Sequence, residues 1–325
     1  MAKRLQVYRY KLIARERIGG RAISGGQEFF GVLVKDAQCG GVGCIHPWPC
    51  FGDAALEEEL AALARGRPLR LGARALACAE ADSRARQEGR SLFDGITIPP
   101  SHYLWGGEEL GRQAEEVAAG GYSAVKLKVG GDPKAVFTHL TEVAELVEVP
   151  LRLDFNAALT ASEARGLFRS LGTDLRRRID LVEDPCPYDS DGWQALAEET
   201  GIDLALDWGF EAGLEQGVLP PGVALGVFKP ARDDGEKLGA HPVLVTSSMD
   251  HPIGQMWAAW WAARVASGLV PGVTARGCGL LTHGHFCGDP ALDLVRQEGS
   301  RLLPPAGTGV GFDDYLEELA WEDLK

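Results

Sequence analysis

The pattern of apolar and polar positions changes near residue 95, and this change divides the chain into two parts. Runs of β-branched and aromatic residues, which favour strands, come first, at 6–13, 29–34 and 43–45. Two stretches rich in Ala, Leu and Glu, which favour helices, follow at 54–65 and 74–88. The pattern therefore predicts a small α+β domain over residues 1–95. Four of the nine residues 18–26 are glycine, so we expect a mobile loop between its first two strands.

After Pro99-Pro100, short apolar runs that end in a polar residue alternate with amphipathic stretches. The runs lie at 124–129, 150–155, 179–184, 202–207, 224–229 and 242–247, and the stretches include 132–147, 160–171 and 191–200. Such alternation predicts parallel βαβ units. Six units without a glycine-rich phosphate-binding turn favour a closed barrel over an open doubly wound sheet. We therefore predict an α/β fold: a modified TIM (β/α) barrel over 96–300 with an N-terminal α+β capping domain, to which the tail at about 300–325 returns.

Composition narrows the class of protein. The 325 residues are 45% hydrophobic and 24% charged, with a mean hydropathy of −0.08, which excludes a disordered chain. The net charge of −13 argues against a nucleic-acid partner, because binding phosphate needs a basic surface. The most apolar stretch, 256–270, is interrupted by Arg264 and is too short to span a bilayer, so we expect no membrane association. Its three tryptophans, at 257, 260 and 261, have the spacing of a buried helix face.

Cysteine usage indicates the compartment. The chain has seven cysteines, an odd number, and none with CxxC spacing, which is typical of a reduced cytoplasmic protein. No continuous apolar segment follows the basic start, so we expect no signal peptide. Nothing in the sequence requires an oligomer.

The informative charges stand at the ends of the predicted strands. They are Lys128, Asp154, Glu183, Asp207 and Lys229, separated by steps of 26, 29, 24 and 22 residues, each about one βα unit. Strand carboxyl ends open on one face of a βα barrel, and that face holds the active site. Any one of these charges alone would be an ordinary solvated loop residue. The set of five in register predicts convergence on one mouth. Period-two alternation adds Lys126 beside Lys128, and aligns Arg152 and Asn156 with Asp154.

Three clustered carboxylates repel one another unless a cation lies between them. Oxygen ligands of this kind suit Mg²⁺, with Mn²⁺ as a possible substitute, whereas zinc prefers His and Cys. A lysine in a partly desolvated position beside a cation has a lowered pKa and can act as a base. The pattern therefore predicts abstraction of a proton α to a carboxylate, through an enediolate, on a small-molecule carboxylate substrate. Cys278, His283, His285 and Cys287 offer an alternative zinc cluster, although their spacing fits no standard site.

These motifs carry a resemblance to a known family. Lys126-Leu-Lys128, Asp154-Phe-Asn156, Glu183-Asp-Pro185, Asp207 and Lys229-Pro230 resemble, in order and spacing, the motifs of the enolase superfamily, specifically its muconate-lactonising-enzyme subgroup. Within that subgroup the stretches at 7–10, 41–51, 246–254 and 279–282 resemble the branch that forms o-succinylbenzoate in menaquinone biosynthesis. The resemblance runs from about residue 5 to 300.

The resemblance implies a role for each matching residue. Asp154, Glu183 and Asp207 would ligate Mg²⁺, Lys128 would be the base that later returns its proton as an acid, and Lys229 would stabilise the enediolate. Lys126 and Arg152 would support the base and the substrate carboxylate, with Asn156 as a further polar contact. Ser247, Ser248 and the glycine-rich loop with Arg21 would line the far part of the substrate. The implied reaction is the syn dehydration of 2-succinyl-6-hydroxy-2,4-cyclohexadiene-1-carboxylate to o-succinylbenzoate.

Departures from the family pattern leave alternatives open. Trp208-Gly209 follows Asp207 where the subgroup usually has Glu-Ser, Asp233-Asp234-Gly235 replaces the usual glycine pair after Lys229, and His251-Pro252 replaces small polar residues. An N-acylamino acid racemase would use Lys128 and Lys229 as two bases on opposite faces. A dipeptide epimerase usually carries an Asp-x-Asp near the last barrel strand, and residues 274–288 contain none. A catalytically silent metal-binding barrel is the alternative from another class.

Overall fold

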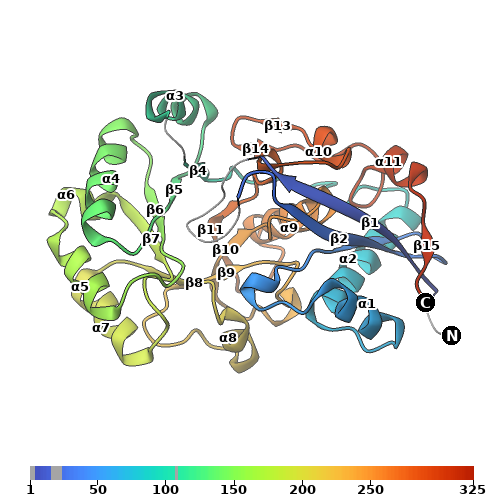
Figure 1. Cartoon of the computed structure of the whole chain (residues 1–325), viewed down its shortest axis with the longest axis horizontal. Coiled ribbons are helices and arrows are strands. Elements are labelled where there is room, and N and C mark those ends of the chain that lie inside the picture. The colour runs from blue at the N-terminus through green and yellow to red at the C-terminus, as the bar shows by residue number, and fades with distance from the viewer. Residues whose placement is uncertain (1–3, 16–23, 107–108) are drawn as a thin grey trace.

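The computed structural model describes residues 4–15, 24–106 and 109–325. In that part of the chain a smaller sheet with two helices lies beside a parallel barrel (Figure 1). Arg21 and most of the predicted loop over 18–26 lie outside the described residues. None of the described helices is long and apolar enough to cross a bilayer.

The smaller unit is built on an antiparallel sheet. Its strands are β1 (Leu5–Ala14), β2 (Glu28–Asp36) and β3 (Val42–Ile45), and its helices are α1 (Leu56–Ala64) and α2 (Arg70–Gln87). Helix α2 packs directly on β3, because Gly41 and Gly43 present no side chain to it. A Cβ on Gly43 would collide with the carbonyl oxygen of Ala75, and one on Gly41 with that of Ala79. A short 3₁₀ turn, η1 (Pro49–Phe51), follows β3 and faces the barrel.

The larger unit is a barrel of eight parallel strands that neighbour one another in chain order. They are β4 (Tyr103–Trp105), β5 (Val125–Lys128), β6 (Leu151–Asp154), β7 (Ile179–Glu183), β8 (Leu204–Leu206), β9 (Leu225–Phe228), β10 (Pro242–Thr246) and β11 (Thr274–Gly279). The first and last strands meet through a parallel bridge between Ser101 and Cys278, where the His102 N–H donates to the Cys278 carbonyl at 2.9 Å. The predicted fold class, a modified (β/α) barrel with an α+β cap, is confirmed.

Helices cover the outside of the barrel. They are α3 (Leu110–Gly120), α4 (Pro133–Leu146), α5 (Ala161–Ser170), α6 (Thr173–Arg178), α7 (Ser190–Thr200), α8 (Phe210–Gln216) and α9 (Pro252–Ala266). Side chains begin several of them: Asp132 caps α4, Asp189 caps α7, and Thr160 forms a reciprocal capping box with Glu163 at α5. Between β9 and β10 only a single 3₁₀ turn, η2 (Gly235–Lys237), replaces a helix. In α9, Trp257 and Trp261 are buried, as the sequence pattern predicts, whereas Trp260 is only partly buried, with Arg264 4.5 Å from its ring centroid.

The chain after β11 returns to the smaller sheet. It contains η3 (His283–His285), β12 (Phe286–Cys287), α10 (Ala291–Leu294), the hairpin β13 (Gln297–Glu298) and β14 (Arg301–Leu302), α11 (Asp313–Glu318) and β15 (Glu322–Asp323). Both β12 and β15 pair antiparallel with β1, and Figure 1 shows this red segment running alongside the blue strands. The sheet of the cap is therefore completed by residues that follow the whole barrel in the chain.

A buried set of polar side chains joins the cap, the barrel and the returning tail. We call it the interface cluster; it consists of Tyr10, Cys44, His46, Asp250, His251, Asp289 and Tyr315. The Tyr10 hydroxyl lies 2.9 Å from His46 Nδ1 and 3.2 Å from Cys44 Sγ. His251 Nδ1 accepts from the Ile253 N–H, so Nε2 carries the ring proton and faces Tyr315 and Asp289. The Tyr315 hydroxyl also donates to Asp289 at 3.1 Å.

Candidate active site

Five consecutive strands bring the predicted charges to one end of the barrel. Lys128 on β5 is paired in register with Asp154 on β6, and Asp154 with Glu183 on β7. Asp207 and Lys229 are the residues that follow β8 and β9. One cavity between barrel and cap is lined by nine of the predicted site residues: Lys126, Lys128, Asp154, Asn156, Glu183, Asp207, Lys229, Ser247 and Ser248. Convergence at the carboxyl ends of the strands follows from their parallel arrangement.

The floor of this cavity is a network of ion pairs. We call its six members the strand-end cluster: Lys126, Lys128, Asp154, Glu183, Asp207 and Lys229. The Lys126 ammonium lies 2.9 Å from Asp154 Oδ2 and 2.7 Å from Glu183 Oε2. The Lys229 ammonium pairs with Asp207. The Lys126 ammonium thus lies between two carboxylates and pairs with both.

The electrostatics of the floor separate the two lysines of β5. Burial lowers the pKa of Lys128, although Asp154 opposes this effect. Burial would also lower the pKa of Lys126, but Asp154 and Glu183 outweigh it and raise that pKa above its usual value. Lys126 is therefore held as a cation, whereas Lys128 is shifted toward the neutral form that can accept a proton.

The carboxylates of the strand-end cluster are not fully neutralised by the lysines. Burial and the neighbouring Asp154 raise the pKa of Glu183 to about 7. Burial pushes the pKa of Asp154 upward as well, but Lys126 and Lys128 bring it below its usual value. Within this cluster the lysines therefore stabilise the ionised form of Asp154 more than that of Glu183. A divalent cation would relieve this repulsion.

The donor set fits a hard cation. Asp154, Glu183 and Asp207 offer carboxylate oxygens from adjacent strands, which Mg²⁺ and Mn²⁺ accept. Among the described residues, no three His, Cys, Asp or Glu side chains are gathered closely enough to hold a metal as they stand; here Lys126 and Lys229 occupy carboxylate oxygens. The alternative zinc cluster does not gather either. The Cys278 thiol instead contacts the carbonyl oxygens of Pro99 and Pro100.

Arg152 occupies a different place from the one expected. It does not line the cavity; it is buried beneath it, where Nε donates to Asp180 at 2.7 Å and Nη2 to the Arg276 carbonyl at 2.8 Å. Its Nη1 lies 3.3 Å from Nδ1 of His102, whose ring does line the cavity. Arg152 is in register with Lys126, which does line the cavity, so the depth of its layer does not explain its place. Its guanidinium is instead held below the cavity by Asp180 and the Arg276 carbonyl.

Two buried carboxylates that the sequence reasoning did not single out hold the backbone of the site. The Asp184 carboxylate accepts the N–H groups of Asp207 and Trp208, each at 3.1 Å. The Asp233 carboxylate accepts the N–H of Lys229 at 2.7 Å. Both thus fix residues of the strand-end cluster through their main chain. The motif Glu183-Asp-Pro185 contained the first of these residues, but only the fold shows what it contacts.

Strained backbone surrounds the mouth of the barrel. Four residues just after strand ends have positive φ without being glycine: Asn156 at 48°, Ala157 at 56°, Asp184 at 41° and Met249 at 56°. Such conformations cost on the order of 1–3 kcal/mol each and concentrate at functional sites. The turns after β6, β7 and β10 are therefore held in place by the surrounding packing.

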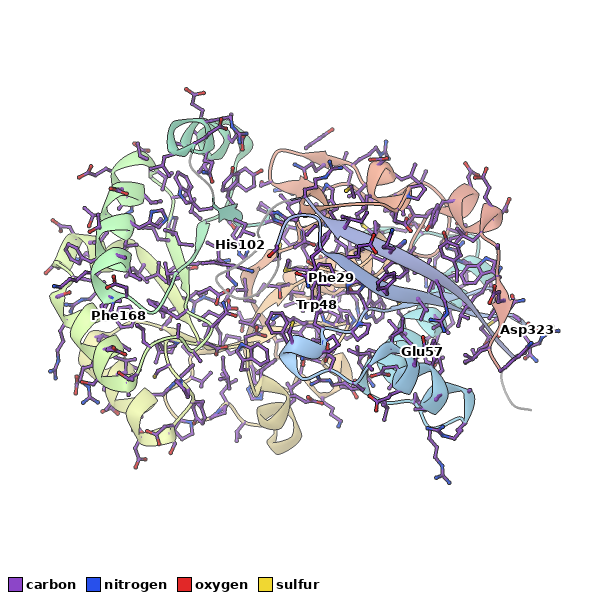
Figure 2. The ribbon with its side chains drawn as sticks, viewed as in Figure 1. Phe29, Trp48, Glu57, His102, Phe168 and Asp323 are labelled. Atoms are coloured by element: carbon purple, nitrogen blue, oxygen red, sulfur yellow. The ribbon has the colours of Figure 1, made fainter. Side chains whose placement is uncertain are left out.

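The upper wall of the cavity comes from the cap and from three barrel loops. Trp48, Phe51, Trp208, Met249 and Leu281 supply apolar surface. Trp48 Nε1 donates to the Ser248 carbonyl at 2.8 Å and thereby links cap to barrel, and Figure 2 shows Trp48 beside Phe29, 4.6 Å between ring centroids. Ser247 Oγ lies 2.8 Å from Thr282 Oγ1. The Ser248 hydroxyl is buried and has no partner among the described residues.

The overall architecture matches solved structures of one class of enzyme. The N-succinyl Arg/Lys racemase of Bacillus cereus superposes with a TM-score of 0.76, covering 99% of each chain at 16% identity. A dipeptide epimerase of Enterococcus faecalis, complexed with Mg and a dipeptide, gives 0.72, covering 95% of this chain and 98% of that one at 17% identity. At these identities the likeness shows the fold. Residues 109–209 match the enolase C-terminal domain-like family model.

Sequence relatives narrow the class further. Residues 5–85 match the N-terminal domain of O-succinylbenzoate synthase. The o-succinylbenzoate synthase of Bdellovibrio bacteriovorus is 32% identical over 311 residues, covering 91% of both chains. That of Citrobacter koseri is 26% identical over 312 residues, covering 89% of this chain and 90% of its own. The chain belongs to the o-succinylbenzoate synthase family of the enolase superfamily.

Proposed function

We propose that this protein dehydrates 2-succinyl-6-hydroxy-2,4-cyclohexadiene-1-carboxylate to o-succinylbenzoate, in menaquinone biosynthesis, with Mg²⁺. The observation that carries the proposal is the strand-end cluster, in which a desolvated lysine, a second lysine and three carboxylates face one cavity. Two features outside the cluster support the substrate: the family membership of the chain and the apolar wall that can accept a ring.

The residues would divide the work as follows. Lys128, neutral at the start, takes the proton from the carbon that bears the ring carboxylate. The electrons of that C–H bond move into the ring carboxylate as an enediolate. Their return forms the ring double bond as the neighbouring C–O bond breaks, and the same ammonium gives its proton to the departing hydroxide. Water leaves, the ring becomes aromatic, and both events occur on one face. General acid–base help of this kind contributes about 10²–10⁴-fold.

The other charged residues would stabilise the anion that forms in between. Asp154, Glu183 and Asp207 would hold Mg²⁺, which supplies Lewis-acid stabilisation of the substrate carboxylate. Lys229, directly after β9 and across the barrel from Lys128 on β5, would face the opposite side of the ring. Lys126 and Arg152 would act from below, Lys126 by keeping a positive charge beside Asp154 and Glu183, and Arg152 by orienting His102.

A second candidate is racemisation of an N-acylamino acid. Lys128 at the end of β5 and Lys229 directly after β9 lie on opposite sides of the barrel, which is the arrangement that two-base proton exchange needs. The structural likeness to an N-succinyl Arg/Lys racemase adds to this candidate.

One assay tests the proposal. Purified protein is mixed with Mg²⁺ and the cyclohexadiene substrate, and the diene absorbance is followed with an EDTA control. We expect rapid, metal-dependent loss of absorbance. Absence of turnover would refute the dehydration; deuterium exchange from D₂O into N-acylamino acids or dipeptides would then identify a racemase or epimerase, and absence of exchange a barrel without catalysis.

A further inference from the structure

One cation in the cavity has no task in the reaction proposed above. Arg232 lines the same cavity as the strand-end cluster, yet it lies in the turn after β9, where its N–H donates to the Lys229 carbonyl at 2.8 Å. It also lines two neighbouring cavities between cap and barrel, which include Phe51, Gly52 and Arg70. Its guanidinium is therefore a positively charged group at the cap side of the cavity, separate from the lysines on the floor.

The partners of Arg232 leave much of its guanidinium available. Its Nη2 lies 3.2 Å from Asp53 Oδ1, but the same oxygen lies 2.8 Å from Nη2 of Arg70. The other oxygen of Asp53 accepts the Trp48 N–H at 2.9 Å. One buried carboxylate thus serves two guanidinium groups, and Arg70 has Glu211 as a second acidic partner at 2.5 Å. A guanidinium has five N–H donors, so most of those on Arg232 are not used by Asp53.

The surroundings also favour a planar anionic group. Arg232 lies over the ring of Trp208, 6.0 Å from its centroid, and Trp208 packs edge-on against Phe51. A cation–π contact of this kind restricts the guanidinium, and a guanidinium can meet a carboxylate with two parallel hydrogen bonds. With Lys128 neutral, the lining has three cationic side chains, Lys126, Lys229 and Arg232, against three acidic ones, so a bound Mg²⁺ would leave an excess of positive charge. An occupant with more than one negative charge would balance it.

We propose that Arg232 is a specificity-determining residue that binds the second carboxylate of the substrate, the one at the end of its succinyl chain. This inference rests on the proposed function, whose substrate carries one carboxylate on the ring and another on the side chain. The ring carboxylate faces the floor, the ring lies along the apolar wall, and the succinyl carboxylate reaches Arg232 beside Trp208.

Binding measurements on the Mg²⁺-loaded protein test this assignment. Two probes are titrated by calorimetry: o-succinylbenzoate, and 2-butanoylbenzoate, in which a methyl group replaces the terminal carboxylate. A charge-assisted bidentate pair contributes on the order of 1.5–3 kcal/mol, or about 10- to 100-fold. We expect Arg232→Gln to lower the affinity for o-succinylbenzoate by that factor and the affinity for 2-butanoylbenzoate by less than about threefold. Arg232→Lys should restore part of the loss.

Arg70→Gln is the matched control. Arg70 shares Asp53 with Arg232 but does not line the catalytic cavity. If Arg232 only anchors the cap, both substitutions should lower the affinity for both probes to the same degree. This result would overturn the assignment. A loss confined to Arg232→Gln and to the dicarboxylate would support it. Turnover by the unmodified protein, measured separately, decides the proposed function: active protein with equal losses refutes only the assignment of Arg232, and inactive protein refutes the reaction.

Discussion

Two buried polar clusters in this protein offset the cost of burying polar groups in different ways. One uses ion pairs between full charges, and the other mainly uses hydrogen bonds between neutral groups. The strand-end cluster is made of full charges that face one another within hydrogen-bond distance. The interface cluster relies mainly on hydroxyl, thiol and imidazole groups: burial lowers the pKa of His46 to about 3 and raises that of Cys44 above its usual range, so both remain neutral. Charged groups are costly to bury and so are concentrated where chemistry requires them, whereas neutral hydrogen bonds join the parts of the fold.

The largest expected effect lies in the strand-end cluster. Lys128→Ala should reduce kcat by about 10²–10⁴-fold, because it removes the proposed base. Mg²⁺ affinity, measured by calorimetry, should change little, since Lys128 is not among the proposed ligands. A variant that keeps nearly full activity would show that another group takes the proton.

Glu183→Gln tests the other function of the same cluster. It removes one carboxylate from the proposed ligand set, so we expect Mg²⁺ affinity to fall by at least the roughly 10- to 100-fold that loss of an outer-shell partner causes. Calorimetric titration with Mg²⁺ measures this, with Glu198→Gln on the exposed side of α7 as control. Unchanged metal affinity would remove Glu183 from the ligand set.

In the interface cluster the expected effect is on stability and depends on pH. Burial raises the pKa of Asp250 to about 7, and its oxygens have no partner among the described residues. The folded state therefore binds this proton more tightly than the unfolded state, whose carboxyl has a pKa near 3.8. Ionisation of Asp250 consequently lowers the free energy of unfolding as pH rises from about 4 to 7. Asp250→Asn should raise that free energy by about 1–3 kcal/mol at pH 8 and change it little at pH 4.

Asp289→Asn is the matched control with the opposite sign. Burial opposes its ionisation, but hydrogen bonds from His251, Ala291 and Tyr315 bring the pKa of Asp289 below its usual value. Its carboxylate therefore stabilises the fold above about pH 4, and this stabilisation is lost as pH falls. Denaturant unfolding at pH 4, 6 and 8 measures both variants. If they shift the free energy of unfolding in the same direction at pH 8, the electrostatic account of this cluster is wrong.

The smallest expected effect comes from removing one hydroxyl. Tyr315→Phe leaves Asp289 and His251 without the hydroxyl between them. Loss of these two hydrogen bonds should lower the free energy of unfolding by about 1–2 kcal/mol, with kcat unchanged. Thermal unfolding and the diene assay measure the two quantities. A large fall in kcat would mean that the two clusters are coupled.

The sequence could predict the features that depend on local spacing along the chain. Strand-end charges recur at one βα unit, so Lys128, Asp154, Glu183, Asp207 and Lys229 could be placed together from spacing alone. The barrel and its cap follow from alternation patterns for the same reason. Arg152 has the right residue type and is in register with the cavity-lining Lys126. Its partners, Asp180 and the Arg276 carbonyl, come from other strands, so its place below the cavity was not predictable.

Contacts between remote segments were not predictable. The bond from Trp48 to the Ser248 carbonyl spans 200 positions, and Tyr10 meets His251 across 241. Nothing in the local pattern at residue 48 or 232 distinguishes a cavity-lining side chain from a surface one. Such pairings depend on how the cap docks, and that depends on packing of the whole chain.

The pairing of β1 with β12 and β15 has a consequence for how the protein is made. A ribosome releases residues 5–14 first and residues 322–323 only after the entire barrel has been synthesised. The edge of β1 therefore stays unpaired throughout most of translation, and an open strand edge invites wrong partners. Chains that stop short of β15 would contain every residue of the strand-end cluster and yet leave one neighbour of β1 missing.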